Sequence, residues 1–298
     1  MGFLASTSDT DPEGQARVAA LRQGLQDLGW IENRNILIDC RWGGGDPNRV
    51  RAYAAELVAS KPDVILASPS SVLAAVQRAT RTIPVVFAQL VDPVGSGFVA
   101  SLAHPGGNIT GFADFEFGIG AKWLELLKQI APPVTRAAVI YDPFTPAASG
   151  FLPMIEAAGR LAGIEVFPYS VREAADLERA IRGFATEPNG GLIAVPSALI
   201  ANKRDLVGSL ALRHRLPSVS GFRYYPANGG LAYYGVDNIS LYKRAASYID
   251  RILKGEHPSN LPVQLPDRYQ LVINLKTAKA LGLEVPPQLL ASVDEVIE

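Results

Sequence analysis

Hydroxyl, amide, carboxylate and aromatic side chains recur in this 298-residue sequence directly after short apolar runs. The early segments are rich in hydroxyl groups, and the later ones are rich in aromatic rings. Because open α/β sheets bind ligands at the carboxyl ends of their parallel strands, we expect these residues to form a small-molecule site. The candidate ligand-binding residues are Ser6, Ser8, Ser68, Ser70, Ser71, Gln89, Asp92, Tyr141, Asp142, Phe144, Pro196, Ser197, Phe222, Arg223, Tyr224 and Asp237.

Ser70 and Ser71 are predicted to cap a helix whose free N–H groups and positive dipole end would bind a carboxylate. A plain cap without ligand contact is the alternative. Asp92, Asp142 and Asp237 are candidates to hold an ammonium group, although an aspartate at a strand end also caps helices. The chemistry expected here is recognition of a small charged molecule.

The aromatic candidates Tyr141, Phe144, Phe222 and Tyr224 could sandwich a flat ligand, with stacking worth about 1 kcal/mol for each ring. Ordinary packing at the loop ends is the alternative. Arg223 could clamp a carboxylate through two hydrogen bonds or point into solvent.

Catalytic, metal and cofactor motifs are not found. The Gly43–Gly45 run lacks the Lys-Ser/Thr pair of a phosphate-binding loop, and no G-x-S-x-G or H-E-x-x-H pattern occurs. Cys40 is the single cysteine and is expected to be a small buried apolar residue. The three histidines lie far apart in sequence. We therefore expect no enzyme activity, no catalytic residue, no metal and no cofactor.

The charge balance argues against a nucleic-acid partner. Lys and Arg number 28 and Asp and Glu number 29, which gives a formal net charge of −1. Nucleic-acid-binding proteins usually carry a basic excess. The longest apolar run, residues 190–201, contains Pro196 and falls short of the roughly 20 residues that a membrane-spanning helix needs.

The elements that must position these residues alternate between strand and helix. Asp46 is predicted to cap a helix that begins at Pro47, and further helices are expected near 146–162, 173–184 and 199–214. This alternation predicts an α/β fold of two doubly wound, parallel-sheet (Rossmann-like) lobes. The predicted strands are 3–5, 36–38, 64–66, 84–87, 109–112, 137–141, 164–168, 192–195, 217–220, 230–236 and 269–273.

The late elements do not fit after a closed second lobe, so we expect the chain to return to the first. Lobe one is predicted to comprise residues 1–113 and 235–266, and lobe two residues 114–234 and 267–298. Three crossovers, at about 112–118, 232–237 and 264–270, would join the lobes, with Gly111 and Gly235 placed to help them flex.

Several longer motifs resemble those of the substrate-binding proteins of ABC transporters, in the tryptophan-binding (TrpX-like) group of type I periplasmic binding proteins. The resemblance spans nearly the whole chain in the right order. The matching segments are Val91–Val99, Pro105–Gly111, Tyr233–Asp237, Ile252–Glu256, Leu261–Val263 and Val272–Gly282.

The resemblance implies an extracytoplasmic, periplasmic protein that closes around a ligand by hinge closure and passes it to an ABC permease. It implies an aromatic amino acid or a related small carboxylate as the ligand, and a monomer as the working form. Asp142 stands where the family more often has Asn, so a carboxylate ligand that lacks an amine is an alternative to an amino acid. We expect that an export signal was removed before Met1. A ligand-sensing module and a two-lobed transferase are the alternative functions.

Overall fold

The computed structural model describes residues 1–145 and 148–298, and the chain divides into two compact units. Unit 1 comprises Met1–Glu116 and Asp237–Arg268, and unit 2 comprises Phe117–Val236 and Tyr269–Glu298. The chain therefore passes between the units after residues 116, 236 and 268. Each of these passages follows a strand end or precedes a strand start.

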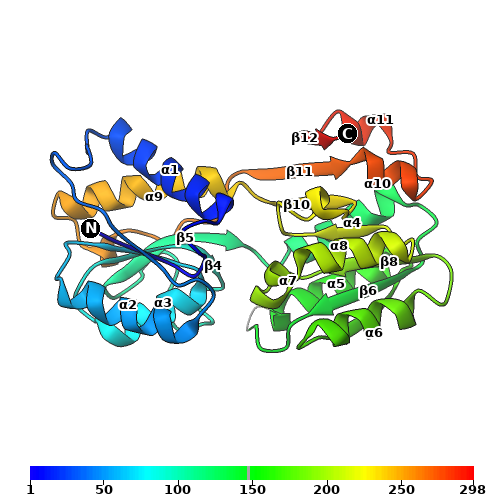
Figure 1. The fold of residues 1–298 in the computed structure, drawn as a ribbon, viewed down its shortest axis with the longest axis horizontal. Helices are drawn as coiled ribbons and strands as arrows, with labels where there is room; N and C mark the ends of the chain where they lie inside the picture. The colour runs from blue at the N-terminus through cyan, green and yellow to red at the C-terminus, as the bar shows by residue number, and fades with distance from the viewer. Residues whose placement is uncertain (146–147) are drawn as a thin grey trace. The chain divides into compact units, whose positions relative to one another are not determined.

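Unit 1 is built on a five-stranded parallel sheet with the strand order β2-β1-β3-β4-β5. Helices α1 and α9 cover one face of this sheet and α2 and α3 the other (Figure 1). The strands are β1 (Gly2–Ala5), β2 (Asp39–Trp42), β3 (Ile65–Ser68), β4 (Val85–Val91) and β5 (Ile109–Phe115); the helices are α1 (Pro12–Asp27), α2 (Pro47–Ala59), α3 (Ser70–Ala79), α9 (Asn238–Leu253) and the 3₁₀ turn η2 (Pro258–Asn260).

Local sequence explains where these helices begin. Asp11 and Asp46 cap α1 and α2 through their side chains, and each helix has proline in its first turn, as their capping chemistry predicts. The four residues of β1 and of β3 are all buried. Such continuous burial is typical of parallel strands that are covered by helices on both faces.

Unit 2 is built on a seven-stranded sheet with the order β12-β11-β10-β9-β8-β6-β7. Its pairs are parallel except that β10 and β11 run antiparallel. The strands are β6 (Arg136–Tyr141), β7 (Glu165–Ser170), β8 (Gly190–Ala194), β9 (Ser218–Ser220), β10 (Ala232–Val236), β11 (Tyr269–Asn274) and β12 (Glu295–Ile297). The helices are α4 (Ile119–Ile130), α5 (Ala148–Ala162), α6 (Ala174–Phe184), α7 (Ala198–Asn202), α8 (Arg204–Arg213), η1 (Pro226–Asn228), α10 (Leu275–Ala280) and α11 (Pro287–Leu290).

The α/β class with two parallel-sheet units is confirmed, but several element predictions are wrong. The second strand is residues 39–42 instead of 36–38, and Leu37 is 71% exposed. Cys40 consequently lies inside β2 and is half-buried, not fully buried. The predicted helix 199–214 is two helices, α7 and α8, and the prediction missed β12. The predicted start of a helix at Pro146 lies outside the described residues.

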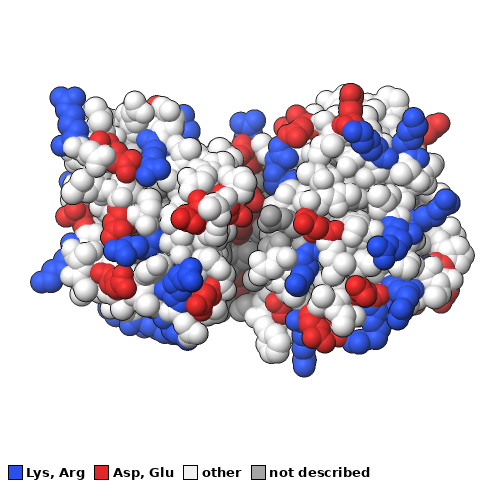
Figure 2. All heavy atoms as spheres, in the orientation of Figure 1, with Lys and Arg blue, Asp and Glu red and all other residues white. Residues whose placement is uncertain are grey.

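Charges of both signs are interspersed over the face of each unit that Figure 2 shows. No helix in the described part of the chain is both long and apolar enough to span a membrane. Within residues 1–145 and 148–298, no group of three His, Cys, Asp or Glu residues is arranged to hold a metal ion.

Candidate ligand-binding site

Polar residues meet at the carboxyl edge of the unit 1 sheet, because β1, β3, β4 and β5 are parallel and end on the same side. Ser68 ends β3, and Gln89 lies in β4 at an irregularity in its pairing with β5. Gln89 has a backbone φ of 58°, a left-handed conformation that is uncommon for a residue other than glycine. The turn of the backbone there directs the Gln89 side chain toward Ser68.

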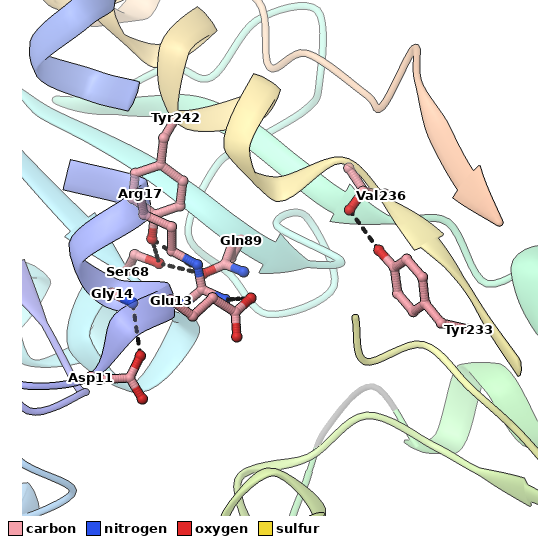
Figure 3. Close-up of polar contacts among 9 residues, drawn as sticks. All are labelled: Asp11, Glu13, Gly14, Arg17, Ser68, Gln89, Tyr233, Val236 and Tyr242. Atoms are coloured by element: carbon pink, nitrogen blue, oxygen red, sulfur yellow. Dashed lines mark hydrogen bonds and ion pairs between the residues drawn. The ribbon is translucent and has the colours of Figure 1, made fainter. Parts of the chain in front are cut away.

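Ser68, Gln89 and Tyr242 form a hydrogen-bonded chain at this edge (Figure 3). The Tyr242 hydroxyl, from α9, donates to Ser68 Oγ over 2.6 Å and lies 3.1 Å from Gln89 Oε1. Ser68 Oγ in turn donates to Gln89 Oε1 over 3.2 Å. Burial raises the pKa of Tyr242, so this hydroxyl keeps its proton. Because Gln89 Oε1 serves as the acceptor, its amide nitrogen is the end of the side chain that offers donors.

Arg17 of α1 brings a largely buried cation to the same cluster. Its guanidinium pairs with Glu13 over 2.5 Å and lies 5.9 Å from the centre of the Tyr242 ring. Burial acts to lower the pKa of Arg17, but Tyr242 and Glu13 raise it overall. Asp11 fixes the first turn of α1 by accepting a hydrogen bond from Gly14 N over 2.7 Å (Figure 3). Arg17 therefore stays charged, and Glu13 pairs with its guanidinium.

Asp114 is a buried carboxylate near the end of β5. Its side chain is within the electrostatic reach of Arg17, and the residue is only 7% exposed. Burial raises the pKa of Asp114 to about 7, against the lowering effects of backbone hydrogen bonds and Arg17. Among the described residues, Asp114 Oδ1 and Arg17 Nε have no hydrogen-bond partner. Such buried polar atoms are rare in folded proteins and call for an explanation.

The other unit 1 candidates lie at strand ends or helix starts. Ser6 and Ser8 follow β1, and Ser8 Oγ lies 2.6 Å from Thr10 Oγ1. Asp92 follows β4 and accepts from Gly95 N over 2.8 Å. Asp237 caps α9 by accepting from Ser240 N over 3.0 Å, and it lies 3.7 Å from Arg268. Asp92 and Asp237 thus each accept a local backbone hydrogen bond with one carboxylate oxygen.

Ser70 and Ser71 do not cap α3, which corrects the prediction for their side chains. The N-cap residue is Pro69, which offers no side-chain hydrogen bond, and both serines already belong to the helix. The first-turn N–H groups of α3 are therefore not covered by a capping side chain. Ser70 is half-buried and Ser71 is exposed.

The unit 2 candidates lie at the carboxyl ends of β6, β8 and β9. Phe222 and Tyr224 are stacked, with ring centroids 5.2 Å apart and an interplanar angle of 13°. Tyr141 ends β6, and Asp142 accepts from the backbone N of Phe144 over 2.9 Å. The strand ends of unit 2 thus carry aromatic rings, whereas the strand ends of unit 1 carry polar groups.

Of the three further unit 2 candidates, Ser197 and Arg223 have structural partners. Pro196 follows β8, and Ser197 caps the short helix α7. Arg223 is ion-paired with Glu295 of β12, and its side chain is 36% exposed. At the end of β10, the Tyr233 hydroxyl donates to the Val236 carbonyl oxygen over 2.8 Å (Figure 3).

Comparison with known proteins decides the family. Residues 11–297 match the family described as ABC transporter substrate binding protein. The chain belongs to this family. The relationship extends over nearly all of the sequence and over both units, as the motif resemblance predicts.

Individual relatives of this substrate-binding protein agree with the family match. It is 27% identical over 263 residues to the tyrosine-binding protein of Clostridioides difficile (strain R20291), covering 88% of this chain and 75% of the relative. A solved domain from Streptococcus pneumonia in complex with L-Trp is 25% identical, with a TM-score of 0.90 over 99% of this chain and 98% of that one. A conserved domain protein from Vibrio cholerae is 28% identical, with a TM-score of 0.89 and 99% coverage of both chains.

Sequence reasoning missed Arg17, Asp114 and Tyr242. Arg17 and Tyr242 lie within helical periodicity, where a charged or aromatic residue is ordinarily read as surface or core. Asp114 was the one with a signal, because a carboxylate within the apolar run 109–115 must be buried if the strand is covered on both faces. The buried charged groups of this substrate-binding protein therefore lie in helices and strands and not in the loops that the sequence pattern indicated.

Proposed function

We propose that this substrate-binding protein captures an aromatic amino acid or a related aromatic carboxylate outside the cytoplasm and delivers it to the permease of an ABC importer. The observation that carries the proposal is the buried polar cluster of Arg17, Ser68, Gln89, Asp114 and Tyr242 at the carboxyl edge of unit 1. This edge is where open parallel sheets bind small molecules.

The ligand class rests on chemistry at both sheet edges and on the relatives. The amide nitrogen of Gln89 and the uncapped first turn of α3 are donors suited to a carboxylate. The stacked rings of Phe222 and Tyr224 suit a flat apolar group. The relatives named above include a protein named for tyrosine binding and a domain solved with L-Trp.

Binding without reaction is part of the proposal, since the cluster pairs its hydroxyl groups with an amide and with each other instead of with a general base. Delivery to a permease and a monomeric working form are further parts of it. Hinge closure on ligand binding stays a prediction, which small-angle scattering with and without ligand would test.

Calorimetric titration with L-tyrosine and L-tryptophan tests the proposed function. We expect one ligand per chain and a thermal midpoint that rises with ligand concentration, because a ligand that binds only the folded state stabilises it by mass action. Glucose is the control, and it should give neither heat nor a thermal shift. Absence of heat and of thermal shift with both amino acids would refute aromatic amino acids as the ligand.

Replacement of Ser70 and Ser71 by alanine tests the carboxylate position. Loss of the hydroxyl groups beside the α3 first turn should weaken binding by about 1–2 kcal/mol. Ser247→Ala removes an exposed helical hydroxyl elsewhere in unit 1 and is the matched control. Equal affinities for the double variant and the control would place the carboxylate elsewhere.

A further inference from the structure

We propose that Asp114 accepts a hydrogen bond from the ammonium group of the ligand and so makes the protein select amino acids over the corresponding deaminated acids. This inference rests on the proposed function and names the group that decides between its two ligand classes. Asp92, Asp142 and Asp237, the predicted ammonium partners, are partly exposed, and each accepts a local backbone hydrogen bond. Asp114 differs because it is buried and one of its oxygens has no hydrogen-bond partner within the described residues.

The first observation is the state of the Asp114 carboxylate. The residue is 7% exposed, and its Oδ1 has no hydrogen-bond partner within the described part of the chain. A buried acceptor of this kind carries an unrecovered desolvation cost. A group that fills the position must donate a hydrogen bond, and a cationic donor gains most from a carboxylate in a site of low polarity.

The second observation is that a complementary donor close by is also unsatisfied. Arg17 Nε is buried without a partner in the described residues, although Asp114 is near enough to shift electrostatically with it. The two groups therefore do not satisfy each other. An α-amino acid has an ammonium donor and a carboxylate acceptor on one carbon, which matches an acceptor on Asp114 and a donor on Arg17.

The third observation is the position of Asp114 in the sheet. Its neighbours Ala113 and Phe115 pair with Leu90 and Val91, directly after Gln89. The sheet register therefore places Asp114 beside the strand end that carries the Ser68–Gln89–Tyr242 hydrogen bonds. The ammonium partner and the carboxylate donors of the proposed site belong to one cluster of unit 1.

The experiment compares two ligand pairs: L-tyrosine with 3-(4-hydroxyphenyl)propanoate, and L-tryptophan with indole-3-propanoate. Each acid lacks only the amine of its partner. Wild-type protein should prefer the amino acid by roughly 10- to 100-fold, as expected for a charge-assisted hydrogen bond. Asp114→Asn should lose most of that preference while its affinity for the deaminated acid changes little.

Asp63→Asn is the matched control, because Asp63 is exposed and precedes β3 at the opposite edge of the sheet. A preference that survives intact in Asp114→Asn would overturn the inference and leave the proposed function standing. Equal binding of both members of a pair by wild-type protein would do the same. Failure of all four compounds to bind would overturn the proposed function together with the inference.

A measurement on wild-type protein keeps the inference testable if Asp114→Asn does not fold. Arg17 of α1 and Tyr242 of α9 interact electrostatically with Asp114, and Glu13 and the N-cap residue Asp11 interact in turn with Arg17. Burial raises the pKa of Asp114 to about 7. Lowering the pH from about 8 to about 5.5 should weaken L-tyrosine binding by at least roughly tenfold and leave the deaminated acid nearly unaffected. Parallel pH profiles for the two compounds would refute the role of Asp114.

Discussion

Asp114 should make the stability of the protein fall as the pH rises, which is the reverse of the usual behaviour of a paired carboxylate. Burial raises its pKa from 3.8 to about 7 in the folded protein. Between these two values the folded state binds more protons than the unfolded state, so the free energy of unfolding decreases with rising pH. The stabilising contribution of the protonated form is complete below about pH 4 and is lost once the pH passes about 7.

The size of the effect follows from the shift in pKa. The pKa rises by about 3, and each pKa unit corresponds to about 1.4 kcal/mol. The free energy of unfolding should therefore change by about 4 kcal/mol between the two ends of this pH range. Asp114→Asn keeps the shape of the side chain and removes its ionisation. The variant should therefore gain stability relative to wild type as the pH rises, by up to about 4 kcal/mol near pH 8.

Urea unfolding of both proteins at about pH 5 and about pH 8 measures the part of this difference that falls between the two pH values, about 3 kcal/mol, and titrations common to both proteins cancel. Asp63→Asn removes an exposed carboxylate and is the control for the loss of one negative charge. A wild-type minus Asp114→Asn difference that is constant over this range would refute burial as the cause of the raised pKa.

Two other substitutions test how the cluster is held. Tyr242→Phe removes the donor to Ser68 and should cost about 1–2 kcal/mol in urea unfolding. Tyr53→Phe is the control and should be nearly neutral, because Tyr53 is half-buried and its hydroxyl has no hydrogen bond within the described residues. Equal effects of the two substitutions would contradict the role of the Tyr242 hydroxyl. Gly14→Ala would place a Cβ atom 2.8 Å from a threonine hydroxyl and 3.0 Å from an indole ring, and it should lower stability by about 1–3 kcal/mol. Gly183→Ala, which meets no atom within 4 Å and lies in α6, should instead stabilise slightly; a thermal melt that ranks the two alanine variants in the other order would contradict the packing argument.

The architecture was predictable because its causes are local. Alternating apolar runs and helical periodicity, with cap signals such as Asp46-Pro47, predict βα units, and the handedness of their crossovers leaves few ways to assemble them. The failure at the second strand has a physical reason. Residues 36–38 are the more apolar run, but β2 lies at the edge of the sheet, where hydrogen bonding to β1 selects the more polar residues 39–42.

The site was predictable only as a set of strand ends. Position after a parallel strand led to Ser68 and Gln89, which the structure does bring together. Pairing across the fold was out of reach, because Tyr242 reaches Ser68 from 174 residues away in the sequence. Arg223 shows the converse, since its partner Glu295 lies in a strand that the sequence pattern did not predict.

The two effects of Asp114 also separate a binding role from a structural one. A carboxylate kept for the fold would be satisfied by its neighbours, and its replacement would lower stability at every pH. A carboxylate kept for a ligand ammonium destabilises the unliganded protein by its desolvation free energy, and the bound ammonium offsets that energy. Its replacement therefore raises stability and lowers selectivity together. Asp114→Asn that is more stable near pH 8 but no longer prefers L-tyrosine over its deaminated analogue is the combination that only the binding role produces.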